Sequence, residues 1–289
     1  MLLYRIDLAS RTVITRTQAC HAPTSITLPG QIETMSQNTI KLACLNGEAE
    51  IFHSIQGEGI NMGVPSIFVR ASLCNLHCVW CDTDYTWNWE NTPWKHEKDS
   101  DSNYQKFKKE DYLIELDTLE VAEKIASLPC RHIIITGGEP LLQDAAWQSV
   151  IKHLLNKKPD YHFEMETNGT LAPSTKLDAM IQQYNVSPKL ANSGNTSNLR
   201  INDQSLAHFV GSKKAWFKFV ISSEADLAEV NQLIMDHHLP EGRVLLMPEG
   251  RDDATLMDRR TWLAEICRDQ GFRFSDRLHI QLWGSKRGV

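Results

Sequence analysis

Short apolar runs that alternate with helical segments constrain the fold of this chain more than any other feature of its sequence. From residue 40 onward, strands are predicted at residues 65–70, 132–136, 162–167, 184–187, 215–222 and 243–248, several of them as short apolar runs such as PSIFVR at 65–70. Strands that alternate with helices of about 10–15 residues form right-handed βαβ units around a parallel sheet. About six such units are too few for a complete eight-stranded barrel. We therefore predict an α/β fold, a partial (β/α) barrel of about six parallel strands.

The segments between these runs are predicted to be helices that bring polar residues together. The helices are expected at residues 118–128, 141–155, 174–183, 224–237 and 254–269, with a final strand over Arg277–Leu282. Polar residues follow several strands directly, at residues 136–139, 166–169, 187–189 and 247–249. Because sites in parallel α/β folds form at the carboxyl ends of the strands, these residues are expected to meet at one site.

Two segments depart from the alternation. Residues 1–39 are rich in Thr, Ser and Pro without sustained periodicity, and Met35 is a candidate for the true start of the chain. We expect this N-terminal extension to be flexible or dispensable; a chain begun at Met35 that failed to fold would contradict this. Residues 40–289 are expected to form one domain with a polar insertion near residues 95–113, whose Lys, Asp, Glu and Ser residues indicate a solvated segment.

Charge and hydropathy argue against two classes of partner. The net charge is −6 and the pI about 6.0, without the basic stripe that nucleic-acid binding requires. No apolar run reaches the roughly 18 residues of a membrane span. The first residues, MLLYRIDLASRTVITR, lack the pattern of a signal peptide. We therefore expect a cytoplasmic protein that binds neither nucleic acid nor membrane.

Three of the seven cysteines lie within eight residues, as Cys74, Cys78 and Cys81 in a C-x3-C-x2-C pattern. In a chain without an export signal, clustered cysteines are more often metal ligands than disulfides. Thiolates suit iron–sulfur clusters, copper(I) or zinc. Three cysteines leave one iron of a four-iron cluster without a protein thiolate, and an open metal position is typical of a catalytic site. A structural zinc site with His77 or His53 as fourth ligand is the alternative, although zinc sites usually contain a second C-x2-C pair.

The cysteine pattern, together with the TGGEP segment at residues 136–140, resembles the radical S-adenosylmethionine superfamily. Further segments narrow the resemblance to the 7-carboxy-7-deazaguanine synthase family: FHSIQGEG at 52–59, GVP at 63–65, CDTDYTW at 81–87, ETNGT at 166–170, SPK at 187–189 and HIQLWG at 279–284. The resemblance covers about residues 45–289. It implies a carbon–nitrogen lyase that converts 6-carboxy-5,6,7,8-tetrahydropterin to 7-carboxy-7-deazaguanine with loss of ammonia, in the pathway to queuosine and other 7-deazapurines.

The same resemblance implies the cofactors and partners. Cys74, Cys78 and Cys81 would hold a [4Fe–4S] cluster, whose open iron would bind the amino and carboxylate groups of S-adenosylmethionine. Mg²⁺ would sit beside the substrate carboxylate. An external electron donor such as a flavodoxin or ferredoxin is expected, and family members are often homodimers.

For S-adenosylmethionine, the resemblance implies contacts from the cysteine loop and from two strand ends. The residues concerned are Trp80, Cys81, Asp82, Gly138, Glu139, Ser187, Pro188 and Lys189. Glycines let backbone groups approach a ligand closely, and an ionised Glu139 can accept hydrogen bonds from the methionyl ammonium. Without the resemblance, these segments would be interpreted as plain turns. Glu166 and Asn168 remain open between a site role and a structural one.

For the pterin substrate, the resemblance implies Ile55, Gln56, Gly57, Glu58, Arg70, Thr136 and Val289. An amide or exposed backbone can bind the donor–acceptor edge of a pterin, and an arginine fork suits its carboxylate. Thr83 is the implied ligand of Mg²⁺, a cation that prefers oxygen. Taken alone, Arg70 would be interpreted as part of a surface ion pair and Thr83 as a loop hydroxyl. No protein residue is assigned as a catalytic acid or base.

Two other functions remain open on the sequence. One is another radical S-adenosylmethionine enzyme, such as a glycyl-radical activating enzyme, but residues 56–59 and 81–83 argue against it. The other is a non-catalytic zinc or cluster-binding module. Anaerobic reconstitution distinguishes the two classes, because the enzyme would bind about four irons and the module one zinc.

Overall fold

A computed structural model of the chain describes residues 38–289. Of the predicted extension at residues 1–39, all but the last two residues lie outside this range, so its dispensability stays a prediction. Thr39 belongs to the folded part, because strand β1 (Thr39–Leu45) begins there. In the described residues, no helix is long and apolar enough to cross a membrane.

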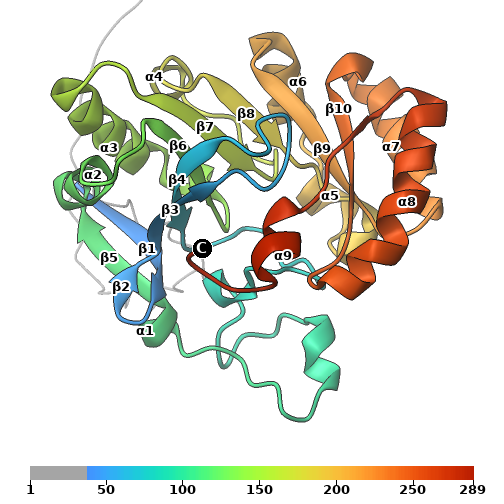
Figure 1. Cartoon of the computed structure of the whole chain (residues 1–289), viewed down its shortest axis with the longest axis horizontal. Coiled ribbons are helices and arrows are strands. Elements are labelled where there is room, and N and C mark those ends of the chain that lie inside the picture. The colour runs from blue at the N-terminus through green and yellow to red at the C-terminus, as the bar shows by residue number, and fades with distance from the viewer. Residues whose placement is uncertain (1–37) are drawn as a thin grey trace, which may run out of the picture. The chain divides into compact units, whose positions relative to one another are not determined.

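Seven parallel strands form the main part of an eleven-stranded sheet. In spatial order they are β4 (Pro65–Ala71), β6 (His132–Gly137), β7 (His162–Thr167), β8 (Gln183–Val186), β9 (Ala215–Ile221), β10 (Val244–Pro248) and β11 (Arg273–Phe274). Figure 1 shows the sheet curving, with the larger helices on its outer side and α9 within the open curve. The predicted partial barrel is confirmed; the strand beyond the predicted six is the two-residue β11.

Four antiparallel strands extend this sheet beyond β4, and none of their pairings was predicted from the sequence. Strand β1 pairs antiparallel with β2 (Glu48–Ala49), β4 and β5 (Leu113–Asp117). Strand β3 (Ile51–Ile55) pairs antiparallel along its whole length with residues 65–69 of β4. This β3–β4 hairpin carries residues 55–58 to the concave side of the sheet.

The outer helices largely follow the predicted segments. They are α2 (Thr118–Ala126), α3 (Asp144–Lys157), α4 (Thr175–Asp178), α6 (Asp203–Ser212), α7 (Ala225–His237) and α8 (Asp253–Gln270). Asp117 caps α2 by accepting a hydrogen bond from the amide of Leu119. The short elements are η1 (Asp84–Thr86), η2 (Glu97–Ser100), α1 (Lys109–Tyr112), η3 (Pro140–Gln143), η4 (Ala191–Ser193), α5 (Ser197–Arg200) and η5 (Glu241–Arg243).

Two predicted elements are wrong. The helix expected at 174–183 is only the four residues of α4, because the chain re-enters the sheet at Gln183. The strand expected over Arg277–Leu282 is instead helix α9 (Leu278–Trp283). Its apolar residues alternate as in a strand, but β11 already occupies the edge beside β10. Of these residues Ile280 is buried, whereas Leu282 is 52% exposed.

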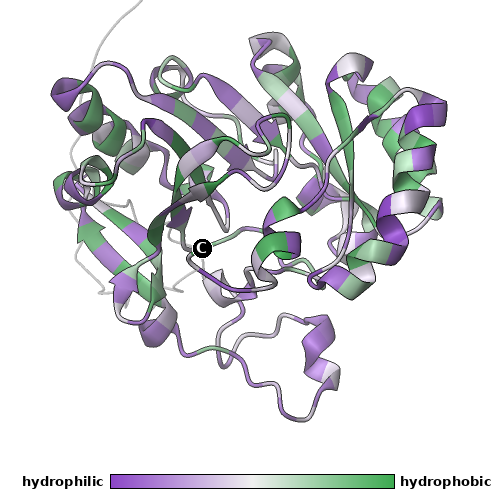
Figure 2. Cartoon of the chain, viewed as in Figure 1, coloured by the Kyte–Doolittle hydropathy of each residue, from purple (hydrophilic) through white to green (hydrophobic). Residues whose placement is uncertain are grey.

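The hydrophobic core lies between the sheet and the outer helices, and strand alternation separates it from the concave face. Along β7, Phe163 and Met165 are fully buried in the core, together with Trp147 of α3. The intervening residues Glu164 and Glu166 belong to the opposite face, where both contact Gln56. Figure 2 shows hydrophobic and hydrophilic residues interleaved along these strands. Each fully buried apolar side chain contributes about 1.5–3 kcal/mol, which fixes the strand register and therefore the direction of the polar residues.

Candidate active site

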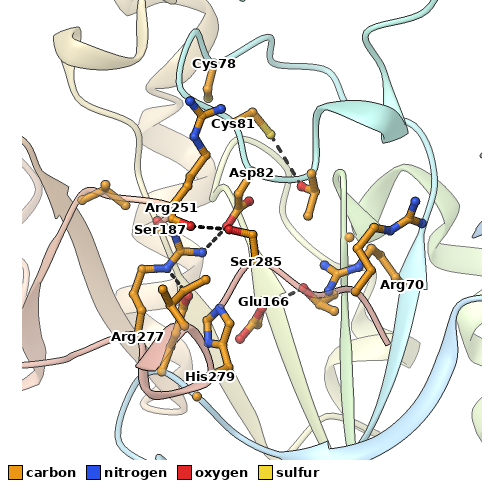
Figure 3. Close-up of a pocket in the computed structure, with 18 of the residues that line it drawn as sticks. Arg70, Cys78, Cys81, Asp82, Glu166, Ser187, Arg251, Arg277, His279 and Ser285 are labelled. Atoms are coloured by element: carbon orange, nitrogen blue, oxygen red, sulfur yellow. Dashed lines mark hydrogen bonds and ion pairs between the residues drawn. The ribbon is translucent and has the colours of Figure 1, made fainter. Parts of the chain in front are cut away.

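A cavity of about 550 Å³ opens on the concave side, at the carboxyl ends of the parallel strands. Figure 3 shows Cys78 and Cys81 at one end of it and Glu166 and His279 at the other. Most predicted site residues line it: Ile55, Gln56, Gly57, Glu58, Arg70, Cys74, Cys78, Trp80, Cys81, Asp82, Thr83, Thr136, Gly138, Ser187, Lys189 and Val289. Glu139 and Pro188 do not. The expectation that polar strand ends converge on one site is therefore met.

The three clustered cysteines lie in the loop after β4, and each sulfur has a polar neighbour. The amide of Leu76 donates to Cys74 Sγ at 3.5 Å, and Asn195 Nδ2 donates to Cys78 Sγ at 3.4 Å. Cys81 Sγ accepts from Trp87 Nε1 at 3.4 Å. Hydrogen bonds of this kind stabilise anionic sulfur and tune the potential of a cluster.

These thiols are not activated by the protein alone. Burial raises the pKa of all three, that of Cys78 to about 12. Without a cation, they would stay protonated near neutral pH, which argues against a nucleophilic cysteine. A coordinated metal deprotonates a thiol outright. Three such thiols on one cavity wall fit the donor set of a [4Fe–4S] cluster with one open iron.

A single zinc ion fits the geometry less well. Within residues 38–289, no three His, Cys, Asp or Glu side chains are placed to hold one ion. The ring of His77 is stacked on Trp94, 3.6 Å between centroids, and burial lowers the pKa of His77 to about 4. His53 is exposed on β3. Neither histidine lines the cavity.

We expected the polar insertion near residues 95–113 to be solvated. Part of it is buried instead. His96 is fully buried and its Nε2 lies 2.9 Å from the carbonyl oxygen of Cys81. Tyr104 donates to Asp84 at 2.7 Å and accepts from Asn88 at 2.8 Å. The insertion therefore packs on the cysteine loop and supports it, and its Lys98 reaches the cavity wall.

The glycines at the end of β6 allow its backbone to lie against the cysteine loop. A Cβ on Gly137, whose φ is +131°, would lie 2.1 Å from the carbonyl oxygen of Ala71, and one on Gly138 would lie 2.0 Å from that of Leu73. The amides of Gly138 and Glu139 donate to these same two carbonyls. Any side chain here would separate β6 from the loop.

Glu139 supports the cavity from behind instead of lining it. Its carboxylate is fully buried and accepts from the amides of Leu141 and Asn168 and from the hydroxyl of Thr167. Burial raises the pKa of Glu139, although these hydrogen bonds oppose the shift. The side chain thus joins the end of β6 to the end of β7.

A network of four charged side chains crosses the cavity. Glu58 forms ion pairs with Lys218 of β9 and with Arg277, whose Nε lies 3.0 Å from Glu58 Oε1. Arg277 also pairs with Asp82 of the cysteine loop. Burial alone would raise the pKa of Glu58, but the two cations hold it well below its usual range. Asp82 is shifted down in the same way, chiefly by Arg277.

Lys218 and Arg277 were not among the site residues predicted from the sequence. Lys218 interrupts the apolar run AWFKFVI, and a buried lysine in a strand is a usable signal because it requires a partner. Arg277 was assigned to a strand that does not exist. Both residues became recognisable only when segments 160 and 219 residues from Glu58 were brought beside it.

Glu166 and Gln56 form a second polar group at the far end of the cavity. Glu166 accepts from Thr136 Oγ1 at 2.7 Å and from Gln56 Nε2 at 3.2 Å. Burial raises the pKa of Glu166. Gln56 also donates to Glu164 at 3.0 Å, and its Oε1 accepts from the amide of Glu58. The amide of Gln56 therefore makes its hydrogen bonds within the protein and orients both glutamates.

The remaining predicted residues lie on the other walls. Arg70 Nε is 3.0 Å from Glu50 Oε1, a buried pair rather than the surface pair that the residue alone suggested. Lys189 donates to Ser187 Oγ at 2.9 Å and lies 5.9 Å from the ring of Trp80. Thr83 Oγ1 is 3.5 Å from Cys81 Sγ.

Comparison with known proteins agrees with this site. The Radical SAM superfamily model matches residues 69–188. A 7-carboxy-7-deazaguanine synthase of Pyrobaculum aerophilum is 35% identical over 83% of this chain and 95% of its own length. One from Halobacterium salinarum is 34% identical over 81% and 89%. The crystal structure of QueE from Escherichia coli aligns with a TM-score of 0.58 at 25% identity, over 83% of this chain and 95% of that one. The chain therefore belongs to the 7-carboxy-7-deazaguanine synthase family of radical SAM enzymes.

Proposed function

We propose that this enzyme converts 6-carboxy-5,6,7,8-tetrahydropterin to 7-carboxy-7-deazaguanine with loss of ammonia, on the route to queuosine-type 7-deazapurines. The observation that carries the proposal is one cavity with three cluster-type thiols at one end and a network of charged side chains that crosses it. Its lining holds eight Lys and Arg side chains but six Asp and Glu side chains, although the whole chain carries a charge of −6. A basic cavity in an acidic protein favours anionic ligands, such as a pterin carboxylate.

The protein's contribution is to bind and orient the cofactors and the substrate and to shield them from water. A [4Fe–4S] cluster with bound S-adenosylmethionine supplies the radical chemistry when present. Cys74, Cys78 and Cys81 would hold the cluster. Trp80, Asp82, Gly138, Ser187 and Lys189 would bind S-adenosylmethionine, with Glu139 and Pro188 supporting them from outside the cavity.

Arg70 is the proposed partner of the substrate carboxylate. Because Glu50 holds its Nε, the two terminal nitrogens of the guanidinium remain for a planar anion. Thr136, Glu58, Gly57 and Ile55 would surround the pterin ring, with Gln56 and Val289 at the edges of the cavity. Glu166, with its raised pKa, stands where a proton can be held beside Thr136.

Anaerobic incubation tests the proposed function directly. Reconstituted enzyme, S-adenosylmethionine, the carboxypterin and a reductant are expected to give 7-carboxy-7-deazaguanine and ammonia in equal amounts. Cleavage of S-adenosylmethionine that no carboxypterin stimulates would favour the glycyl-radical activating enzyme instead. A colourless protein with one zinc and no cleavage would favour the non-catalytic module.

Magnesium dependence is proposed through Thr83, which lines the cavity two residues after Cys81 and offers a hydroxyl oxygen, the kind of ligand that Mg²⁺ prefers. Thr83→Val keeps the shape and removes the oxygen. It is expected to raise the Mg²⁺ concentration for half-maximal activity by at least about 10-fold, comparable to losses on altering a metal site. The exposed Thr196→Val is the matched control. Turnover that ignores chelation and magnesium add-back would refute the assignment.

An external electron donor and a homodimer complete the proposal. The cluster must be reduced from outside because none of the side chains that line the cavity supplies the electron, and a flavodoxin or ferredoxin has suitable chemistry. A cytoplasmic location would keep the thiols reduced and ready for the cluster. Sedimentation of the reconstituted enzyme tests the dimer.

A further inference from the structure

The segment after α9 returns to the cavity, where Arg287 makes ion-pair and aromatic contacts and Ser285 donates a hydrogen bond to the carbonyl oxygen of Arg251. Residues 284–289 line the cavity, and Figure 1 shows the end of this segment lying within the curve of the sheet. Arg287 Nη2 lies 2.6 Å from Glu50 Oε2 and 3.0 Å from the carbonyl oxygen of Cys44. Its guanidinium carbon is 3.5 Å from the centroid of the Tyr85 ring.

Glu50 connects Arg287 to Arg70. Its carboxylate is 2% exposed and has Arg70 on one oxygen and Arg287 on the other. Tyr85 donates a further hydrogen bond to Glu50 Oε1 at 3.2 Å. Two arginines that share one buried carboxylate constrain each other, because each fixes the position of the oxygens that the other must meet.

We propose that Arg287 is a positioning residue for substrate selection: it seats residues 284–289 over the cavity and fixes the Glu50 carboxylate that orients Arg70. The inference rests on the proposed function, in which Arg70 binds the substrate carboxylate. Without the Arg287 guanidinium, one oxygen of Glu50 loses its partner, so Arg70 can rotate to bind that oxygen as well. The guanidinium of Arg70 then turns away from the cavity, and binding of the carboxylate weakens. The hydrogen bonds to the three cysteine sulfurs do not involve Arg287 and are expected to remain.

The test uses Arg287→Gln, the conservative Arg287→Lys, and Arg273→Gln as matched control. Arg273 also lies over an aromatic ring, Trp216 at 4.8 Å, but outside the cavity. The first readout is amide hydrogen exchange of residues 284–289 in the reconstituted enzyme. Arg287→Gln is expected to increase the exchange rate of these amides at least tenfold, Arg287→Lys less, and the control not at all.

The second readout is kinetic. Arg287→Gln is expected to raise KM for the carboxypterin about tenfold with kcat changed less than threefold, and to reduce by a similar factor the discrimination against tetrahydropterin without the carboxylate. Arg287→Lys should show smaller changes in both KM and discrimination than Arg287→Gln. Unchanged exchange, or a fall in kcat with unchanged KM and discrimination, would overturn the proposal. Because exchange needs no turnover, failure of the proposed function would be seen separately as absence of product in the wild type.

Discussion

Replacing Cys78 by alanine is expected to abolish cluster binding and all activity that depends on it. Cys78 lies on the cavity wall and supplies one of the three thiols proposed as iron ligands. Removing only an outer-shell partner of a metal can lower affinity by about 10–100-fold, so the loss of a direct ligand should exceed this. Anaerobic reconstitution should give about four irons per chain in the wild type and less than one in the variant. Cleavage of S-adenosylmethionine should fall below detection.

A matched control separates the loss of a ligand from the loss of any cysteine. The Cys130 thiol also makes a weak hydrogen bond, which it donates to the carbonyl oxygen of Pro65 at 3.1 Å, but it lies outside the cavity. Cys130→Ala is expected to bind iron like the wild type. Thermal unfolding of the metal-free proteins checks that Cys78→Ala is folded. Full iron content in the Cys78 variant would eliminate this cysteine as a ligand.

The sequence predicts the parallel part of the fold because its signals are local. Strands β6, β9 and β10 are compact, largely apolar runs, and strand alternation places Glu166 of β7 and Thr136 of β6 on one face. The antiparallel extension could not be predicted in the same way. Strand β1 pairs with β5 across more than 70 residues, and no local pattern encodes that pairing. The wrong prediction of a strand at Arg277–Leu282 has a similar origin. The segment could have been a strand only if the sheet edge beside β10 were free, and β11 occupies that edge.

The site residues that could be predicted are likewise those that lie close together in the sequence. The cysteine loop and the TGGEP segment are contiguous, so their residues were recognisable together. The ion pairs of Glu58 join residues from three distant segments, and only the fold brings them together. The buried His96 shows the reverse case, because a composition typical of solvated chain conceals one side chain that packs on the cysteine loop.

Glu58→Gln is expected to destabilise the metal-free protein by about 3 kcal/mol at neutral pH. Removing one partner of a buried ion pair costs about 3–5 kcal/mol because the other charge stays buried, and the lower end applies where a cavity admits water. Here two cations, Lys218 and Arg277, would lose their shared carboxylate. Glu123→Gln is the matched control: its partner Lys157 is 3.8 Å away and both side chains are exposed. Its expected effect is below about 0.5 kcal/mol.

The effect of Glu58→Gln on the free energy of unfolding should depend on pH, whereas an effect due only to lost packing would not. The pKa of Glu58 is lower in the folded protein than in the unfolded chain, where it is about 4.3. The stabilisation is therefore complete above that value and is lost as the pH falls below it, since the unfolded chain then binds the proton first. Denaturant unfolding between about pH 7 and pH 3.5 should show the difference between wild type and Glu58→Gln shrinking toward acid. A difference that stays constant over this range would mean that the glutamate acts by shape and hydrogen bonding, and not through its charge beside Lys218 and Arg277.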